Sequence, residues 1–312
     1  MSADGVPAGG ASATDAPALR DAACELARAA GAILLEGYGR VHAPERKGRI
    51  DLVTEYDRRS EALLLERIRA RFPEHAILAE ESGAHAGVPA ATGGPPAGTV
   101  GPPTGKAGST AGRGPAGATR AGVRWICDPL DGTTNFAHNY PFFCVSVGVE
   151  VAGVMAAGAV YDPVRDELFA AAAGEGATRN DAPIHVSALG KLDDALLVTG
   201  FPYDVREHPE RHLPLFQEFL LRAQGVRRDG SAALNLCYVA MGRFDGMWEG
   251  NLNPWDIAAG SLIVREAGGT ITGYAGEALR LDGRRIVAAN PALHARMLEV
   301  VALHPEAGVV VG

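Results

Sequence analysis

The feature that most constrains this chain is an apolar run at 125–127 that leads into two aspartates three positions apart, Asp128 and Asp131. Pro129 and Gly132 predict a tight bend there, so both carboxylates should leave the end of a strand and point at one spot. Two carboxylates without a basic neighbour repel each other unless a cation lies between them. Such oxygen ligands suit Mg²⁺, which takes one or two carboxylates and keeps water and phosphate in its other positions. A surface turn rich in Asp and Gly is the alternative interpretation.

Gly132, Thr133 and Thr134 extend the hypothesis to an anion. Their backbone N–H groups and hydroxyls are the donors that a phosphate needs where a loop runs into a helix. The segment therefore favours a site for a metal ion and a phosphate ester.

Three further segments end apolar runs in acids. They are 47–57, which ends in Asp57, 77–83, which contains Glu80 and Glu81, and 253–260, which contains Asp256. Each alone has an ordinary explanation, because Asp57 and Asp256 could be acids favoured in the first turn of a helix. The Glu80-Glu81 pair could equally be part of a solvated loop. Taken together, four acidic endings beside apolar runs predict one shared site.

These motifs resemble those of the inositol monophosphatases, within the wider group of Mg²⁺-dependent, lithium-sensitive phosphatases. Segment 128–134 is similar to the family's first signature and segment 255–269 to its second. Segments 51–57 and 80–82 match in order and spacing. The resemblance runs from about Ala18 to about Leu303 with one interruption, and four motifs in one order form a specific combination.

The resemblance implies an α/β layered fold, an alternating α-β-α-β-α sandwich of the sugar-phosphatase type, built as one compact unit of an α+β and an α/β half. Alternating strand and helix patterns in the C-terminal half agree with this. The expected domain spans 16–303, with a disordered tail at 1–15 and a short tail at 304–312. A Gly/Pro/Ala-rich insertion at 84–121 interrupts it, and we expect disorder there because such a composition cannot offset its ordering entropy.

Apolar periodicity and turn residues predict the individual elements. Helices are expected at about 17–38, 58–71, 213–223, 231–241 and 255–267, with a last one after Asn290-Pro291. Strands are expected at 77–79, 142–149, 154–161, 168–172, 195–199, 226–228, 244–248 and 285–289.

The resemblance also implies roles for the acids. Metal ligands for two or three Mg²⁺ ions would be Glu80, Asp128, the carbonyl of Leu130, Asp131 and Asp256. Thr133, paired with Glu80, would position or deprotonate the attacking water, with Asp57 organising the pair. Lys47 would lie in a loop over the metals, although a plain solvated lysine is the alternative. Glu81 is expected to face solvent.

Substrate contacts follow from the same resemblance. Gly132, Thr133 and Thr134 would hold phosphate oxygens, while Gly230, Ser231, Ala232, Glu249 and Asp256 would meet the rest of the substrate. A carboxylate such as Glu249 accepts hydrogen bonds from ring hydroxyls, which suits a polyol.

The implied function is Mg²⁺-dependent hydrolysis of myo-inositol 1-phosphate and related small phosphate monoesters to inositol and phosphate, by a metal-activated water. The same chemistry on fructose-1,6-bisphosphate, histidinol phosphate or adenosine 3′,5′-bisphosphate is left open. So is an added role in binding the transcription machinery, which some bacterial relatives have. The nine histidines are scattered along the chain, so a zinc site is not expected.

Composition narrows the remaining classes. The formal net charge is −8 without a polybasic run, so nonspecific binding to nucleic acid has no electrostatic footprint. The four cysteines lie in apolar contexts without a CxxC pair and indicate reduced core residues. Without a signal-peptide pattern or a membrane-length apolar run, we expect a soluble, cytoplasmic protein. The resemblance adds a homodimer, with which an apolar sheet edge at 142–151 would be compatible.

Overall fold

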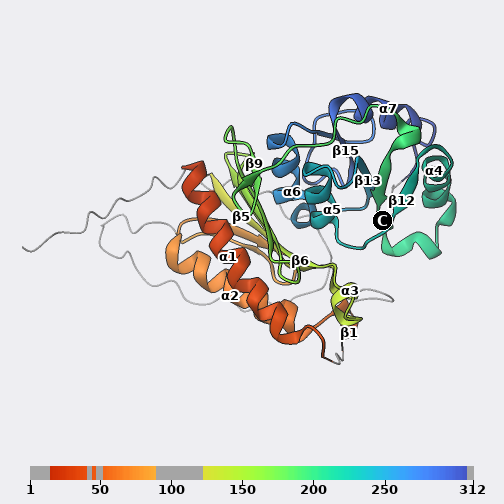
Figure 1. Cartoon of the computed structure of the whole chain (residues 1–312). Coiled ribbons are helices and arrows are strands. Elements are labelled where there is room, and N and C mark those ends of the chain that lie inside the picture. Colours follow the sequence, from red (N-terminus) through yellow and green to blue (C-terminus); the bar gives the residue numbers. More distant parts are fainter. Residues whose placement is uncertain (1–14, 41–43, 47–51, 89–121, 308–312) are drawn as a thin grey trace, which may run out of the picture.

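The computed structural model describes residues 15–40, 44–46, 52–88 and 122–307, and within them helices and sheets alternate in five layers (Figure 1). An outer pair of helices, α1 (Ala16–Gly37) and α2 (Glu55–Arg71), covers an eight-stranded sheet. Behind it lie α5 (Ala232–Ala240) and α6 (Pro254–Glu266), then a five-stranded sheet, then α4 (Pro209–Arg222) and α7 (Pro291–Val301). The predicted α-β-α-β-α order is confirmed.

The larger sheet runs in the order β10-β9-β8-β7-β6-β5-β3-β4. Its strands are β3 (Ala76–Ala79), β4 (Gly83–His85), β5 (Val123–Asp131), β6 (Cys144–Val151), β7 (Val154–Asp162), β8 (Glu167–Ala172), β9 (Ala177–Arg179) and β10 (Ala182–Pro183). β3 and β5 are parallel, and the other described neighbours are antiparallel. Because β6 pairs with β5 on one side and β7 on the other, the expectation of an apolar sheet edge at 142–151 is wrong.

The smaller sheet runs in the order β12-β11-β13-β15-β14. Its strands are β11 (Leu196–Thr199), β12 (Gly225–Arg227), β13 (Gly246–Gly250), β14 (Thr270–Thr272) and β15 (Arg285–Ala289). Outside the two sheets lie β1 (Glu45–Arg46), β2 (Leu52–Val53), α3 (Thr133–Ala137) and two short 3₁₀ turns, Leu192–Asp194 and Tyr203–Arg206. β13 begins two residues later than expected, and β14 was not predicted.

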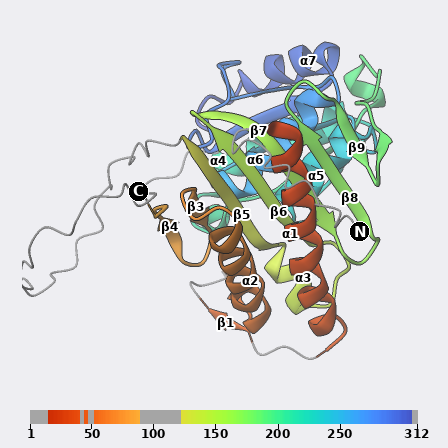
Figure 2. The ribbon, with the colours of Figure 1, turned by 90° about the vertical axis from the view of Figure 1, so that its left-hand side faces the viewer.

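The outer helices begin where the sequence provides caps. Pro17 lies in the first turn of α1, a position where its missing N–H costs nothing. α2 begins three residues earlier than expected, because Thr54 and Asp57 form a capping box around its first turn. Figure 2 shows α1 and α2 side by side across the larger sheet. Their buried apolar residues form one core cluster with residues of that sheet.

α6 packs unusually close to the larger sheet, because glycines face it. A Cβ on Gly148 would lie 2.8 Å from the Ala258 Cβ, and one on Gly158 would lie 2.9 Å from the Ala259 Cα. The close approach brings α6 into contact with β5, β6 and β7. Residues with larger side chains at either glycine would move this helix away from the sheet.

The domain limits differ from the expected ones at two places. β4 pairs with β3, and the N–H of Val88 donates to the Pro73 carbonyl at 2.7 Å, so residues 84–88 belong to the fold and not to the insertion. Ala307 is 4% exposed and packs in the core, so the fold also continues past 303. The rest of the expected insertion, 89–121, lies outside the described residues, as do residues 1–14 and 308–312.

None of the helices in the described segments is both long enough and apolar enough to span a membrane.

Candidate active site

A bulge in β5 brings Asp128 and Asp131 to the same side of the strand. Asp128 pairs with Ser146 and Asp131 with Cys144, so three steps along β5 match two along β6. In a regular strand, residues three apart would point to opposite faces. The prediction of a tight bend at Pro129 and Gly132 is therefore wrong, because a bulge within the strand brings the two carboxylates together. The strand continues through both aspartates and ends at Asp131; the next residue, Gly132, has a φ of 98° that few other residues adopt.

Both aspartates line a cavity of about 400 Å³ between the two sheets. Of the site residues predicted from the sequence, those on its wall are Glu80, Asp128, Leu130, Asp131, Gly132, Thr133, Thr134, Gly230, Ser231, Ala232, Glu249 and Asp256. Asp57 is the exception. The cavity thus gathers side chains from β5, the turn after β3, and the starts of α3, α5 and α6.

The acids of this cavity alter one another's protonation. Burial raises the pKa of Asp128 well above its ordinary value, and the carboxylates of Glu80 and Asp131 raise it further. Burial and nearby Asp131 likewise raise the pKa of Asp256. Burial raises the pKa of Asp131 to about 6, although the hydrogen bonds that it accepts oppose the shift. Because the cluster repels its own negative charge, a bound cation would stabilise its ionised form.

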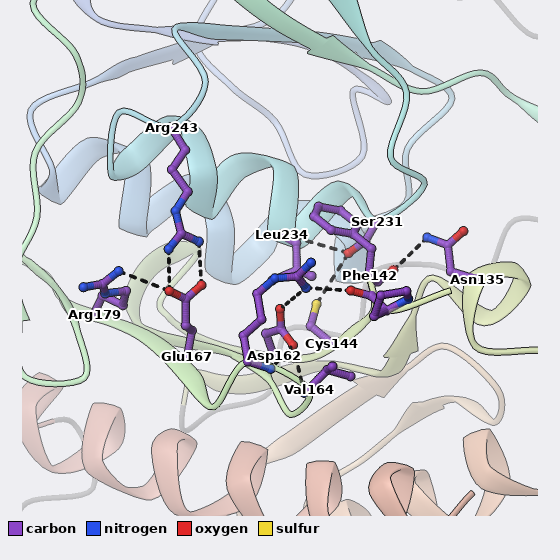
Figure 3. A network of polar contacts seen from close by, with 12 residues as sticks. Asn135, Phe142, Cys144, Asp162, Val164, Glu167, Arg179, Ser231, Leu234 and Arg243 are labelled. Carbon is purple, nitrogen blue, oxygen red and sulfur yellow. Dashed lines mark hydrogen bonds and ion pairs between the residues drawn. The ribbon is translucent and has the colours of Figure 1, made fainter. Parts of the chain in front are cut away.

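Asp131 is held from one side by the start of α5. Its Oδ2 accepts hydrogen bonds from the Ser231 hydroxyl at 2.7 Å and from the Ala233 N–H at 2.6 Å. The Cys144 Sγ lies 3.6 Å from the Ser231 Oγ (Figure 3). Ser231 is 1% exposed and its hydroxyl orients Asp131. The substrate contact expected for it from the sequence stays a prediction.

Asp57 is fully buried and contacts Thr133 instead of the cavity. Its Oδ1 accepts from the Thr133 hydroxyl at 2.9 Å, while its Oδ2 accepts from the Thr54 N–H at 2.8 Å and from the Thr54 hydroxyl at 2.6 Å. Burial raises the pKa of Asp57, and these hydrogen bonds oppose that rise. The Thr133 hydroxyl also lies 3.0 Å from the Leu130 carbonyl, so two acceptors share its one proton.

Asp256 serves the helix and the cavity together. It stands in the first turn of α6, where its Oδ2 accepts from the Asn253 N–H at 2.6 Å and closes a capping box. The same carboxylate lines the cavity. The cap fixes the carboxylate at the cavity wall.

Glu249, on β13, faces the cavity from the smaller sheet. Burial raises its pKa to about 8, with Asp131 adding to the shift and Arg228 opposing it. Its Oε2 is buried and has no hydrogen-bond partner within the described part of the chain. A Cβ on Gly200 would lie 1.9 Å from Oε1, so the glycine makes room for this carboxylate.

Several residues that line this cavity were not predicted from the sequence. They include Gly200, Arg228, Asn251 and Arg284. Nothing in the sequence around Gly200 showed that this position must be small to admit a carboxylate from another strand. The two arginines lie on loops, where a charged residue normally faces solvent.

The donor set suits a hard divalent cation. Carboxylate oxygens and a backbone carbonyl are the ligands that Mg²⁺ prefers, and the described residues contain no group of three His, Cys, Asp or Glu already arranged around one ion. Mg²⁺ rarely needs such a cage, because it keeps several waters and takes further oxygens from substrate phosphate. The acids therefore fit Mg²⁺ as an open site.

Two further expectations concern the neighbourhood of Glu80. Lys47 lies outside the described residues. Glu81 does more than face solvent, because its N–H donates to the Glu61 Oε2 at 2.8 Å and it lines a second cavity beside α2.

The fold and the acid-lined cavity define the class of protein, an α/β-layered phosphatase. Residues 15–306 match the model of the Inositol monophosphatase family, and the chain belongs to that family.

Individual relatives are similar to this chain over most of its length. The chain is 44% identical to the inositol-1-monophosphatase of Synechocystis over 285 residues, which cover 91% of this chain and 88% of that protein. It is 37% identical to the Nus factor SuhB of Escherichia coli K12, over 88% of this chain and 92% of that one. Among solved structures, inositol monophosphatase from Anabaena superposes with a TM-score of 0.75 at 42% identity, covering 93% of this chain and 97% of that chain.

Proposed function

We propose that this phosphatase hydrolyses myo-inositol 1-phosphate and related small phosphate monoesters with the help of Mg²⁺. The observation that carries the proposal is one cavity lined both by clustered acids and by Glu249, whose Oε2 has no hydrogen-bond partner among the described residues. The clustered acids suit a phosphate with its metal ions, and the Glu249 carboxylate suits an alcohol rich in hydroxyls. The name of the Synechocystis relative supports the same substrate.

The metal ligands would be Glu80, Asp128, the Leu130 carbonyl, Asp131 and Asp256. Bound Mg²⁺ supplies Lewis-acid polarisation of the phosphate and a water of lowered pKa. Ser231 and Ala233 both donate to the Oδ2 of Asp131, so its Oδ1 would be the oxygen that meets the ion.

Thr133 would hold the attacking water. Its hydroxyl donates to Asp57 or to the Leu130 carbonyl, so its oxygen is left to accept a hydrogen bond from a water that Glu80 also binds. The buried Asp57 thereby sets the direction of the Thr133 proton, a positioning role. Backbone N–H groups of Gly132 and Thr133, with Thr134 beside them, would donate to phosphate oxygens.

A substrate panel with Mg²⁺ tests the assignment. It compares myo-inositol 1-phosphate with fructose-1,6-bisphosphate, histidinol phosphate and adenosine 3′,5′-bisphosphate. We expect the highest kcat/KM for the inositol ester, loss of activity in excess chelator and inhibition by lithium. A clear preference for another ester would overturn the inositol assignment, and full activity in chelator would overturn the metal mechanism.

Asp128→Asn should abolish hydrolysis and leave the fold intact, because an amide cannot replace the negative charge that would hold the metal. We expect a fall in kcat of more than about 100-fold, against a much smaller fall for Glu81→Gln. Circular dichroism and melting temperature check folding in both variants. Equal and mild losses would contradict the metal assignment.

A second candidate function is binding to the transcription machinery. It is favoured by the relatives that are named Nus factor SuhB. Titration of purified RNA polymerase with the protein and with Asp128→Asn tests it, because a binding role should survive loss of catalysis. We further infer a homodimer in the cytoplasm, which light scattering and cell fractionation would test.

A further inference from the structure

Three polar side chains on α2 point into the protein. Asp57, Ser60 and Glu61 are 0%, 0% and 4% exposed. Positions three and four apart share one face of a helix, so the three form a single buried polar strip. Burying a carboxylate costs free energy unless hydrogen bonds compensate it, and a helix that needed only to pack would carry apolar residues there.

Each member of the strip holds a different segment of the active site. Asp57 accepts from the Thr133 hydroxyl, as described above. The Ser60 hydroxyl donates to the Pro129 carbonyl at 2.8 Å, inside the bulge between Asp128 and Asp131. Glu61 accepts at Oε2 from the Glu81 N–H at 2.8 Å, in the turn that carries Glu80. One face of α2 therefore contacts the three segments that carry Glu80, Asp128 with Asp131, and Thr133.

The turn held by Glu61 is short. β3 ends at Ala79 and β4 begins at Gly83, so the turn consists of 80–82. Within the described residues, β4 is an edge strand of the larger sheet and pairs only with β3. The turn between these two strands therefore has no further strand beside it.

Behind this turn lies a second cavity of about 480 Å³, lined by residues that include Glu61 and Glu81. Packing against solid protein is therefore absent on this side, within the part of the chain that the structure describes. The hydrogen bond from the Glu81 N–H to the Glu61 carboxylate ties the turn to α2 on this side, in addition to the 2.7 Å contact between Ser82 Oγ and His85 Nε2.

We propose that Glu61 is a positioning residue that fixes the 80–82 turn so that Glu80 faces the acid-lined cavity. Ser60 does the same for the bulge of β5. The expected effect on the affinity for Mg²⁺ rests on the proposed function. The restraint on the turn does not, because it follows from the contacts of α2 alone.

Two substitutions separate the hydrogen bond from the charge. Glu61→Ala removes the acceptor, whereas Glu61→Gln keeps an oxygen that can accept from the Glu81 N–H. Glu66→Ala is the matched control on the exposed side of α2. Leu64→Val is the stability control, because Leu64 is fully buried on the same helix but makes none of these contacts.

The first measurement is amide hydrogen exchange of the 80–82 turn in metal-free protein. Glu61→Ala should speed exchange there by about tenfold or more, and Glu61→Gln should stay close to the unaltered protein. The two controls should leave this exchange unchanged. Unchanged exchange in Glu61→Ala, or equal acceleration in Glu61→Gln, would overturn the restraint.

The second measurement is the affinity for Mg²⁺ by calorimetry. We expect Glu61→Ala to bind roughly 10–100-fold more weakly, the usual effect of losing a group that orients a ligand. An equal weakening in Leu64→Val would mean that lost stability is the cause, and would overturn the positioning role. If the unaltered protein binds no Mg²⁺, the proposed function fails, while the exchange experiment still decides whether Glu61 holds the turn.

Discussion

At the scale of single residues, the structural and the functional interpretation of an acid are often both correct. Asp57 and Asp256 each close a capping box at a helix start, which is the ordinary role that the sequence allowed for them. Asp57 nevertheless reaches Thr133, and Asp256 lines the cavity. The cap is what makes each carboxylate rigid, because a side chain bonded to its own helix has few other rotamers.

Residue types at the site were predictable, but their partners were not. The motifs named the acids because apolar runs end there. Ser60 contacts Pro129 across 69 positions, and Ser231 contacts Asp131 across 100 positions. Such pairs depend on how the sheets and helices pack, and no local pattern around a serine shows which distant oxygen its hydroxyl will meet.

Glu249→Ala should separate substrate selection from chemistry. The Oε2 of Glu249 has no partner in the described part of the chain, so a substrate hydroxyl can satisfy it. For inositol phosphate, kcat/KM should fall by the equivalent of roughly 1–3 kcal/mol in activation free energy, the cost of losing hydrogen bonds to a buried polar group. An aryl phosphate without such hydroxyls should lose much less.

Gly200→Ala is a second route to the same effect, since its Cβ would lie 1.9 Å from the Glu249 Oε1 and displace the carboxylate. Parallel losses on both substrates in Glu249→Ala would place this residue in the metal site or the fold. Unchanged kinetics on both would remove it from the site.

At the scale of elements, the spacing of apolar residues and the turn residues predicted most helices and strands of the core to within a few residues. What they could not give is pairing. The bulge in β5 exists because Asp131 pairs with Cys144 and Asp128 with Ser146, a register that belongs to two strands together. For the same reason, the buried position of β6 was mistaken for an edge, since an apolar strand has the same sequence in either place.

The junction of α2 and β3 carries a pH-sensitive contact. His75 is 6% exposed, accepts at Nδ1 from the Trp125 indole N–H at 3.0 Å and stacks on Phe72. Burial lowers the pKa of His75 below its ordinary value. The unfolded chain therefore binds a proton more readily than the folded one, so this contribution to stability is present above about pH 6.5 and decreases as the pH falls below it.

His75→Gln should flatten the loss of unfolding free energy between about pH 7 and pH 5, because glutamine offers an acceptor that does not titrate in that range. Urea unfolding followed by tryptophan fluorescence measures the slope. His138→Gln, at an exposed histidine, is the control and should keep the slope of the unaltered protein. An unchanged slope in His75→Gln would mean that His75 titrates alike in both states.

At the scale of the whole molecule, the cavity exists because two sheets meet around α5 and α6. The larger sheet contributes Asp128 and Asp131, the smaller sheet contributes Glu249, and the two central helices contribute Ser231 and Asp256. Both ends of α5 are tied to the larger sheet. Ser231 at its start contacts Cys144, and Arg243 just beyond its end pairs with Glu167 (Figure 3). The alternation of elements predicted the layers, but only the packed layers show that segments far apart in the sequence share one cavity.

Replacing residues 90–120 by a linker of about six glycines and serines should change neither stability nor turnover. The flanking residues are held by the fold itself, because the Val88 N–H donates to Pro73 and the Gly122 carbonyl accepts from the Ala152 N–H at 2.6 Å. β4, β3 and β5 are neighbours, so the flanks lie about two strand spacings apart, roughly 10 Å, which six residues span.

The cut has to come after Val88. A Cβ on Gly87 would lie 2.1 Å from the Glu74 carbonyl, so the chain is still packed against the fold there. A longer deletion that also removes 83–88 strips β4 from β3, frees the turn that carries Glu80, and should lower both melting temperature and Mg²⁺ affinity. Melting curves and kcat for the two deletions compare these outcomes. A collapse of kcat in the shorter deletion would mean that residues 90–120 contribute to the active site.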